Sequence, residues 1–122
     1  MTKTKQLEKI VIKALKELKA IDIVTIDVKH VTSITDAMII CTGTSSRHVK
    51  SIADKVLQNL SIEKIKPLSV EGENEGEWVL IDIVDIMVHI MQQRTRDFYQ
   101  LETLWHIPKL KKKPTSKKGT VK

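Results

Sequence analysis

Two short apolar runs separated by an acidic break, within residues 77–91, constrain the fold more than any other feature of this chain. Both runs are rich in β-branched residues, and Asp82 and Asp85 stand at the break between them. This pattern is typical of a β-hairpin, with strands at 77–83 and 85–91. Each run is long enough for a strand and too short to span a membrane.

Helical and strand patterns cover the rest of the chain. Apolar residues at helical spacing predict two further helices, the second capped by Ser45 or Ser46, and apolar or β-branched runs predict three further strands. The expected elements are helices at 4–19 and 46–60 and strands at 21–28, 37–42 and 68–71. Their order predicts one α/β (α+β) domain, residues 1–108, with a mixed sheet of about five strands flanked by helices. The unit at 37–71 allows a right-handed parallel crossover, and the end of the sheet is expected to be antiparallel.

Three of the four aromatic residues lie in a last predicted helix at 95–105, and the fourth, Trp78, begins a strand. This helix is expected to bury Phe98, together with Leu101 and either Leu104 or Trp105. Tyr99 would then lie at the edge or on the surface, with Glu102 on the same side of the helix. Trp and Tyr favour interfaces, so a protein partner is one interpretation, and burial of all three large aromatics in the core is the other.

The net charge of +6 belongs to the C-terminal tail. From Lys109 onward the chain has seven Lys and no acid; removing these seven from the 21 basic residues leaves 14 against 15 acids. The composition of residues 109–122 predicts a disordered lysine-rich tail. Such a tail either aids solubility or contacts RNA phosphates without sequence preference.

Motifs for catalysis are weak. Gly43-Thr44-Ser45, between a strand and a helix, suits a turn and cap better than a phosphate site, because the P-loop lysine spacing is missing. Asp82 and Asp85 are placed to stabilise a turn rather than to hold metal ions as in a nucleotidyltransferase. The single Cys41 lies in an apolar run, where a buried thiol is expected rather than a nucleophile.

The sequence therefore predicts no catalytic residue, no metal site and no cofactor. The four His are scattered without zinc-ligand spacing. The N-terminus shows no secretion signal, and one Cys cannot form an internal disulfide, so a cytoplasmic protein is expected.

A set of motifs in order resembles the ribosomal silencing factor family, also called RsfS or Iojap, of the bacterial type. The match covers most of residues 5–106. Its most specific parts are Trp78-Val79-Leu80-Ile81-Asp82, Val88-His89-Ile90 and Tyr99-Gln100-Leu101-Glu102-Thr103-Leu104-Trp105, the last preceded by the matching Arg96-Asp97-Phe98.

The resemblance implies a small domain related in fold to nucleotidyltransferases but without their catalytic carboxylates. It implies binding to the large ribosomal subunit through ribosomal protein uL14, which blocks joining of the small subunit and represses translation when nutrients run low. It also implies homodimers when the protein is free, and a role in large-subunit assembly in organelle relatives. A nucleotidyltransferase-like enzyme and an RNA-binding domain that acts through its tail remain as alternatives.

The motifs and the resemblance together give the candidate binding residues. Two departures from the family pattern are Ala37, where an aromatic is frequent, and Val84, where a Gly usually precedes Asp85. Val84 predicts either a different turn or backbone strain. The expected partner contacts are Trp78, Tyr99, Leu101, Glu102 and Trp105, with Asp82, His89, Arg96 and Asp97 as second choices.

Overall fold

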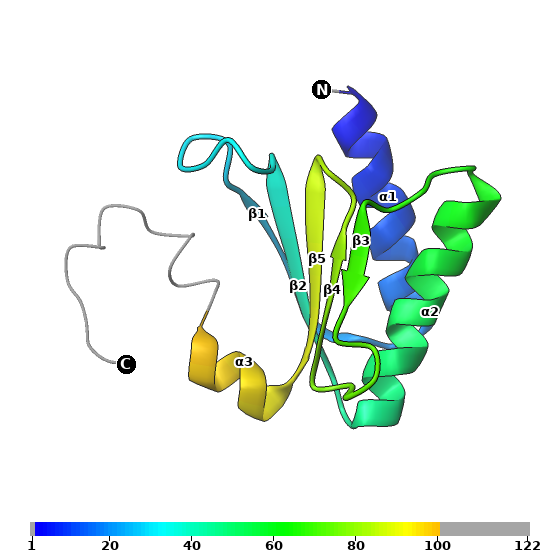
Figure 1. Ribbon diagram of the computed structural model, residues 1–122, viewed down its shortest axis with the longest axis vertical. Helices are drawn as coiled ribbons and strands as arrows, with labels where there is room; N and C mark the ends of the chain where they lie inside the picture. The colour runs from blue at the N-terminus through cyan, green and yellow to red at the C-terminus, as the bar shows by residue number, and fades with distance from the viewer. Residues whose placement is uncertain (1, 101–122) are drawn as a thin grey trace.

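Five strands and three helices follow one another in the order that the sequence predicts (Figure 1). The structure, a computed structural model, describes residues 2–100, with side chains from residue 4 onward. The predicted tail, 109–122, lies outside these residues. The elements are α1 (Thr2–Glu17), β1 (Ile21–Asp27), β2 (Ala37–Gly43), α2 (Ser46–Ile62), β3 (Ser69–Glu71), β4 (Trp78–Asp82), β5 (Ile86–Gln92) and α3 (Gln93–Tyr99).

The sheet is mixed, with the strand order β1-β2-β5-β4-β3. β2 and β5 are parallel, in register from Ala37 opposite Ile86 to Gly43 opposite Gln92. The other three pairs are antiparallel, so the predicted hairpin of β4 and β5 and the mixed sheet are confirmed. All seven residues of β2 are buried, as its continuous apolar run predicts.

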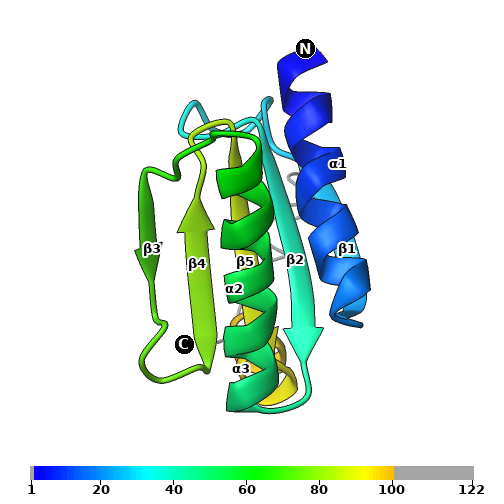
Figure 2. The ribbon, with the colours of Figure 1, turned by 90° about the vertical axis from the view of Figure 1, so that its right-hand side faces the viewer.

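The main core lies between one face of the sheet and the layer formed by α1 and α2 (Figure 2). Both helices contribute their apolar stripes to it, and β2 contributes Ala37, Ile39 and Cys41. Burial raises the pKa of the Cys41 thiol to about 12, although the positive charge of Arg96 acts in the opposite direction. Cys41 is fully buried, as the sequence predicts, and its raised pKa favours the protonated thiol at neutral pH.

The turn between β4 and β5 carries the strain that Val84 predicts. Val84 has a φ of 73°, a value that β-branched residues avoid, and its side chain is 55% exposed. The Asp85 N–H donates to the Ile83 carbonyl at 2.9 Å, which closes a three-residue turn around Val84. Asp82 Oδ1 accepts the Val84 N–H at 2.8 Å, so the predicted turn role of Asp82 is confirmed.

Replacing Val84 by Gly is expected to stabilise the fold by about 1 kcal/mol. The change removes the cost of a left-handed β-branched residue, about 1–3 kcal/mol, and adds the smaller entropic cost of Gly in the unfolded chain. Urea unfolding measures the difference. Val84→Ala serves as the matched control, because it shortens the same exposed side chain but keeps a Cβ at positive φ. Equal stability of the Gly and Ala variants would contradict the strain.

Candidate functional site

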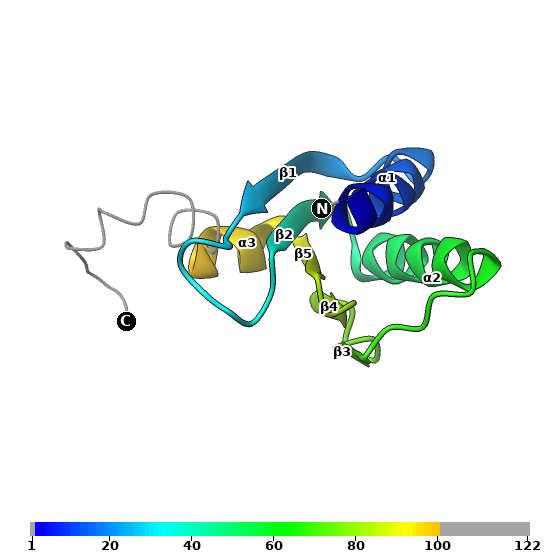
Figure 3. The ribbon, with the colours of Figure 1, turned by 90° about the horizontal axis from the view of Figure 1, so that it is seen from above.

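The second face of the sheet, opposite α1 and α2, carries α3 at one end (Figure 3). A small separate cluster of apolar side chains lies on this face. It is formed by Ile26, Val28, Met38, Ile40 and Met91, with Val24 and Trp78 packed against it. The face is therefore apolar at its centre, and α3 contacts the central strand β5 and its neighbour β2.

Trp78 reaches this face because side chains alternate along β4. Val79 and Ile81 enter the main core, so Trp78 points to the other side, opposite Met91 of β5. The indole is half-buried, and its Nε1–H donates to His89 Nδ1 at 3.0 Å. This hydrogen bond ties the one aromatic residue of the sheet to a buried polar side chain.

Tyr99 and Phe98 extend the aromatic surface outward from Trp78. The Tyr99 ring lies 4.8 Å from the Trp78 ring between centroids, tilted by 50°. Phe98 meets Tyr99 edge to face, at 4.9 Å. Phe98 is 78% exposed and Tyr99 51%. We call Trp78, Tyr99 and Phe98 the aromatic row; it runs from the half-buried indole into solvent, and such contiguous exposed aromatics mark interaction surfaces.

Arg96 anchors α3, which is too short to be stable by itself. Its Nη1 donates to the Asp22 carbonyl and to Thr42 Oγ1, both at 2.8 Å. Arg96 is only 6% exposed, so its guanidinium lies under α3 and bridges it to β1 and β2. Because Tyr99 lies three residues further along this helix, Arg96 also helps to fix the position of the exposed part of the aromatic row, Tyr99 and Phe98.

The predicted helix at 95–105 differs from α3 in three ways. α3 begins at Gln93 and ends at Tyr99, and Gln100 caps it in the left-handed conformation at a φ of 47°. The predicted burial of Phe98 is wrong, because Phe98 is largely exposed. The short helix α3 is held to the sheet through Arg96, so its attachment does not require Phe98 to be buried. Tyr99 is exposed, in line with the interpretation that put it at the edge or on the surface, although that interpretation assumed a buried Phe98.

The remaining predicted contacts are scattered. Asp82 is half-buried in its turn, and Asp97 accepts a hydrogen bond from Gln93 Nε2 at 2.8 Å within α3. His89 is buried beneath Trp78, and burial lowers its pKa to about 4, so it is neutral at physiological pH. Leu101, Glu102 and Trp105 lie outside the described residues. Sequence patterns did not signal the contacts of His89 and Arg96, because each partner is distant in sequence.

The turn before α2 uses its backbone donors locally. Ser45, one of the two residues predicted as the cap, is the N-cap of α2. Its Oγ accepts a hydrogen bond from the His48 N–H at 3.1 Å. The Thr44 N–H donates to His48 Nδ1 at 2.8 Å, and the other ring nitrogen of His48 donates to the Leu18 carbonyl at 2.7 Å. The segment therefore joins α2 to the end of α1 and confirms a turn and cap.

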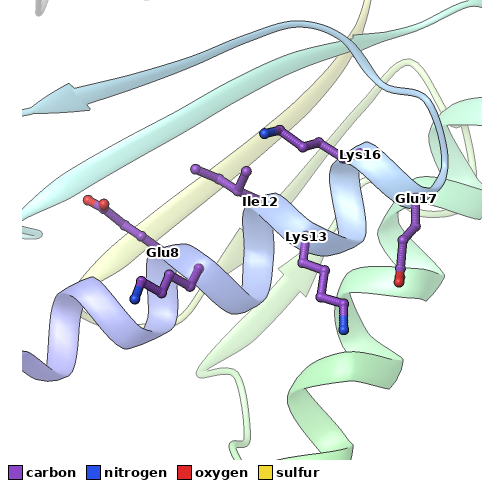
Figure 4. Close-up of a pocket in the computed structure, with 6 residues that line it drawn as sticks. Glu8, Ile12, Lys13, Lys16 and Glu17 are labelled. Atoms are coloured by element: carbon purple, nitrogen blue, oxygen red, sulfur yellow. The ribbon is translucent and has the colours of Figure 1, made fainter.

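Other surfaces offer little for chemistry. Within residues 2–100, no three His, Cys, Asp or Glu side chains are close enough to hold a metal ion. A shallow open hollow of about 550 Å³ lies along the outside of α1, but its lining residues all come from that one helix. Figure 4 shows Glu8, Ile12 and Lys16 leaving the helix on one side and Lys13 and Glu17 on the other, so no charges converge there. No helix in the described part of the chain is long and apolar enough to cross a bilayer.

Comparison with known families identifies the domain. A family model described as "Ribosomal silencing factor during starvation" matches residues 1–122. The chain belongs to the ribosomal silencing factor family. A ribosomal silencing factor of Haemophilus influenzae is 46% identical over 91 residues, which cover 75% of this chain and 89% of that protein. The resemblance seen in the motifs is thereby confirmed.

Solved structures of the ribosomal silencing factor family share the fold. A crystal structure of a protein from Chromobacterium violaceum superposes with a TM-score of 0.82 at 36% identity, covering 94% of this chain and 92% of that one. A mouse relative, "Mitochondrial assembly of ribosomal large subunit protein 1", is 31% identical over 94 residues, covering 75% of this chain and 41% of that protein. The α+β fold with a five-stranded mixed sheet is therefore common to the ribosomal silencing factor family and this chain.

Proposed function

We propose that this protein binds the large ribosomal subunit through ribosomal protein uL14 and sterically prevents the small subunit from joining. Translation is repressed because bound large subunits leave the pool that can join. The protein acts in the cytoplasm, without catalysis and without a cofactor. Assistance in large-subunit biogenesis is a second consequence of the same binding, in line with the name of the mouse relative.

The aromatic row is the observation that supports a binding role. Phe98 and Tyr99 are exposed although the chain has only four aromatic residues, and they continue directly from Trp78. Aromatic residues grouped on an exposed surface supply much of the affinity in protein interfaces. In the free protein the same surface pairs two copies as a homodimer, so that binding to uL14 and self-association compete.

Co-sedimentation with separated ribosomal subunits tests the proposal. We expect the full-length protein to sediment with the large subunit and not with the small one, and to reduce the formation of joined ribosomes. A version ending at Pro108 should behave similarly, with a modest loss of affinity from any contact of the lysine tail with rRNA. Equal binding to both subunits, or complete loss without the tail, would instead support an RNA-binding domain.

A Tyr99→Ala variant is expected to bind the large subunit about 1–2 kcal/mol more weakly, a loss of roughly five- to thirty-fold. The phenol is exposed and belongs to the aromatic row, so its removal should affect binding more than stability. Ile62→Ala is the matched control, because Ile62 is an exposed apolar side chain on α2, in the layer on the other side of the sheet. Sedimentation at several protein concentrations measures both affinities, and equal affinities would remove Tyr99 from the interface.

A further inference from the structure

His89 is a polar residue in apolar surroundings. It lies in the centre of the sheet, on the second face, and is 5% exposed. Its cross-strand neighbours are Ile40 of β2 and Leu80 of β4, both aliphatic. Packing alone would favour another aliphatic residue here, since a buried polar group must find hydrogen-bond partners.

Among residues 2–100, only one ring nitrogen of His89 has a hydrogen-bond partner. Nδ1 accepts the hydrogen bond from Trp78 Nε1–H, so the neutral ring carries its proton on Nε2. Nε2 is buried and has no hydrogen-bond partner among the described residues. A buried donor that residues 2–100 leave without a partner lowers the stability of this part of the fold, so packing within it does not explain the presence of His89. What the ring supplies is one acceptor for the indole of Trp78.

This acceptor sets the orientation of Trp78. Trp78 lies opposite Met91, and His89 is two residues back along β5, so the hydrogen bond runs diagonally across the pair of strands. The two rings lie 5.8 Å apart between centroids, tilted by 43°. Tyr99 then packs against the indole at 4.8 Å. The orientation of Trp78 therefore determines the ring surface on which Tyr99, in the exposed part of the aromatic row, packs.

We propose that His89 is a positioning residue, which holds the Trp78 indole in one orientation so that the aromatic row is preorganised for its protein partner. A side chain that is already ordered loses less conformational entropy on binding, so preorganisation raises affinity without any new contact. The role of His89 is exercised through Trp78, since His89 itself is buried. The effect on affinity rests on the proposed function, whereas the effect on the indole does not.

Hydrogen exchange at the indole of Trp78 tests the positioning directly in the free, full-length protein. The Trp105→Phe background leaves Trp78 as the only indole in the chain, and its Nε1–H gives one resolved NMR signal. We expect slow exchange with His89 in place and exchange at least about tenfold faster in the His89→Leu variant, which lacks the acceptor. His89→Asn restores slow exchange, because the Asn carbonyl oxygen can occupy the position of Nδ1.

Affinity for the large subunit should follow the same order. We expect His89→Leu to bind about five- to tenfold more weakly and His89→Asn to bind nearly as well as the wild type. Met87→Leu, on the same face of β5 and opposite Asp82, is the matched control and should change neither quantity. Circular dichroism and the urea midpoint of each variant establish that it is folded at the temperature of the assay.

Two results would overturn the positioning role. One is unchanged indole exchange in the folded His89→Leu variant, and the other is a His89→Asn variant as impaired as His89→Leu in exchange. Failure of the wild type to bind the large subunit would contradict the proposed function instead, while the exchange measurement would still decide whether His89 orients Trp78.

Discussion

Replacing Gly72 by Ala is expected to destabilise the protein by about 3–5 kcal/mol. Gly72 follows β3 at a φ of 87°, and a Cβ built on it would lie 2.0 Å from the carbonyl oxygen of Trp78. A backbone oxygen of β4 cannot move away without breaking the pairing of β3 and β4, where Glu71 lies opposite Leu80. Urea unfolding at neutral pH measures the loss.

A second substitution separates the clash from the strain of the positive φ. Asn tolerates the left-handed region but has a Cβ, so Gly72→Asn should be destabilised almost as much as Gly72→Ala. The neighbouring exposed residue provides the control: Glu73→Ala should change stability by less than about 0.5 kcal/mol. Recovery of stability in Gly72→Asn would show that conformational strain, rather than the approach of Trp78, makes the glycine necessary.

Acid is expected to destabilise the protein by about 3 kcal/mol between neutral pH and pH 4 through His89 alone. Burial lowers the pKa of His89 from 6.5 to about 4. Between these pH values the unfolded chain binds a proton that the folded protein does not bind. The free energy of unfolding therefore decreases as the pH decreases. The contribution is therefore fully present above about pH 6.5 and is lost as the pH falls to about 4.

The free energy of unfolding, measured in urea across pH 4–7.5, checks this dependence. The His89→Leu variant is the control, because it keeps every other titratable group of the chain. Its stability should fall less steeply with acid than that of the wild type, and the difference between the two curves isolates His89. Parallel curves would mean that His89 becomes protonated in the folded protein near its ordinary pKa.

Patterns within one element, or within two consecutive strands, were sufficient to predict most of the fold. Local spacing of apolar residues predicted the buried stripe of α2, the buried strand β2 and the hairpin of β4 and β5. The structure confirms all three. The strain at Val84 was one of two alternatives, the other being a different turn, that followed from the Gly usual in the family at this position; the positive φ of Val84 shows that it is strain.

The site was less predictable, because its contacts join distant residues. Helical periodicity placed Phe98 in the core, but α3 is held by Arg96, whose acceptors belong to β1 and β2. Likewise, His89 in an apolar strand signals burial, while its bond to Trp78 depends on the register of β4 against β5. Tyr99 was expected at the edge or on the surface on the assumption that Phe98 faces the core; Tyr99 is exposed, but so is Phe98, so the position of Tyr99 does not follow from that assumption.

The parallel pairing of β2 with β5 has a consequence for how the chain reaches its native state. β1 pairs with β2, and β3, β4 and β5 form a second set, and each set can assemble from residues near in sequence. The two sets meet only where β2 joins β5, across the whole of α2 and two strands. Because closing so long a loop is slow, this meeting is expected to limit the folding rate. During synthesis, the middle of the sheet can therefore form only after residues 86–92 have been made. In a chain that still lacks these residues, one edge of β2 is unpaired.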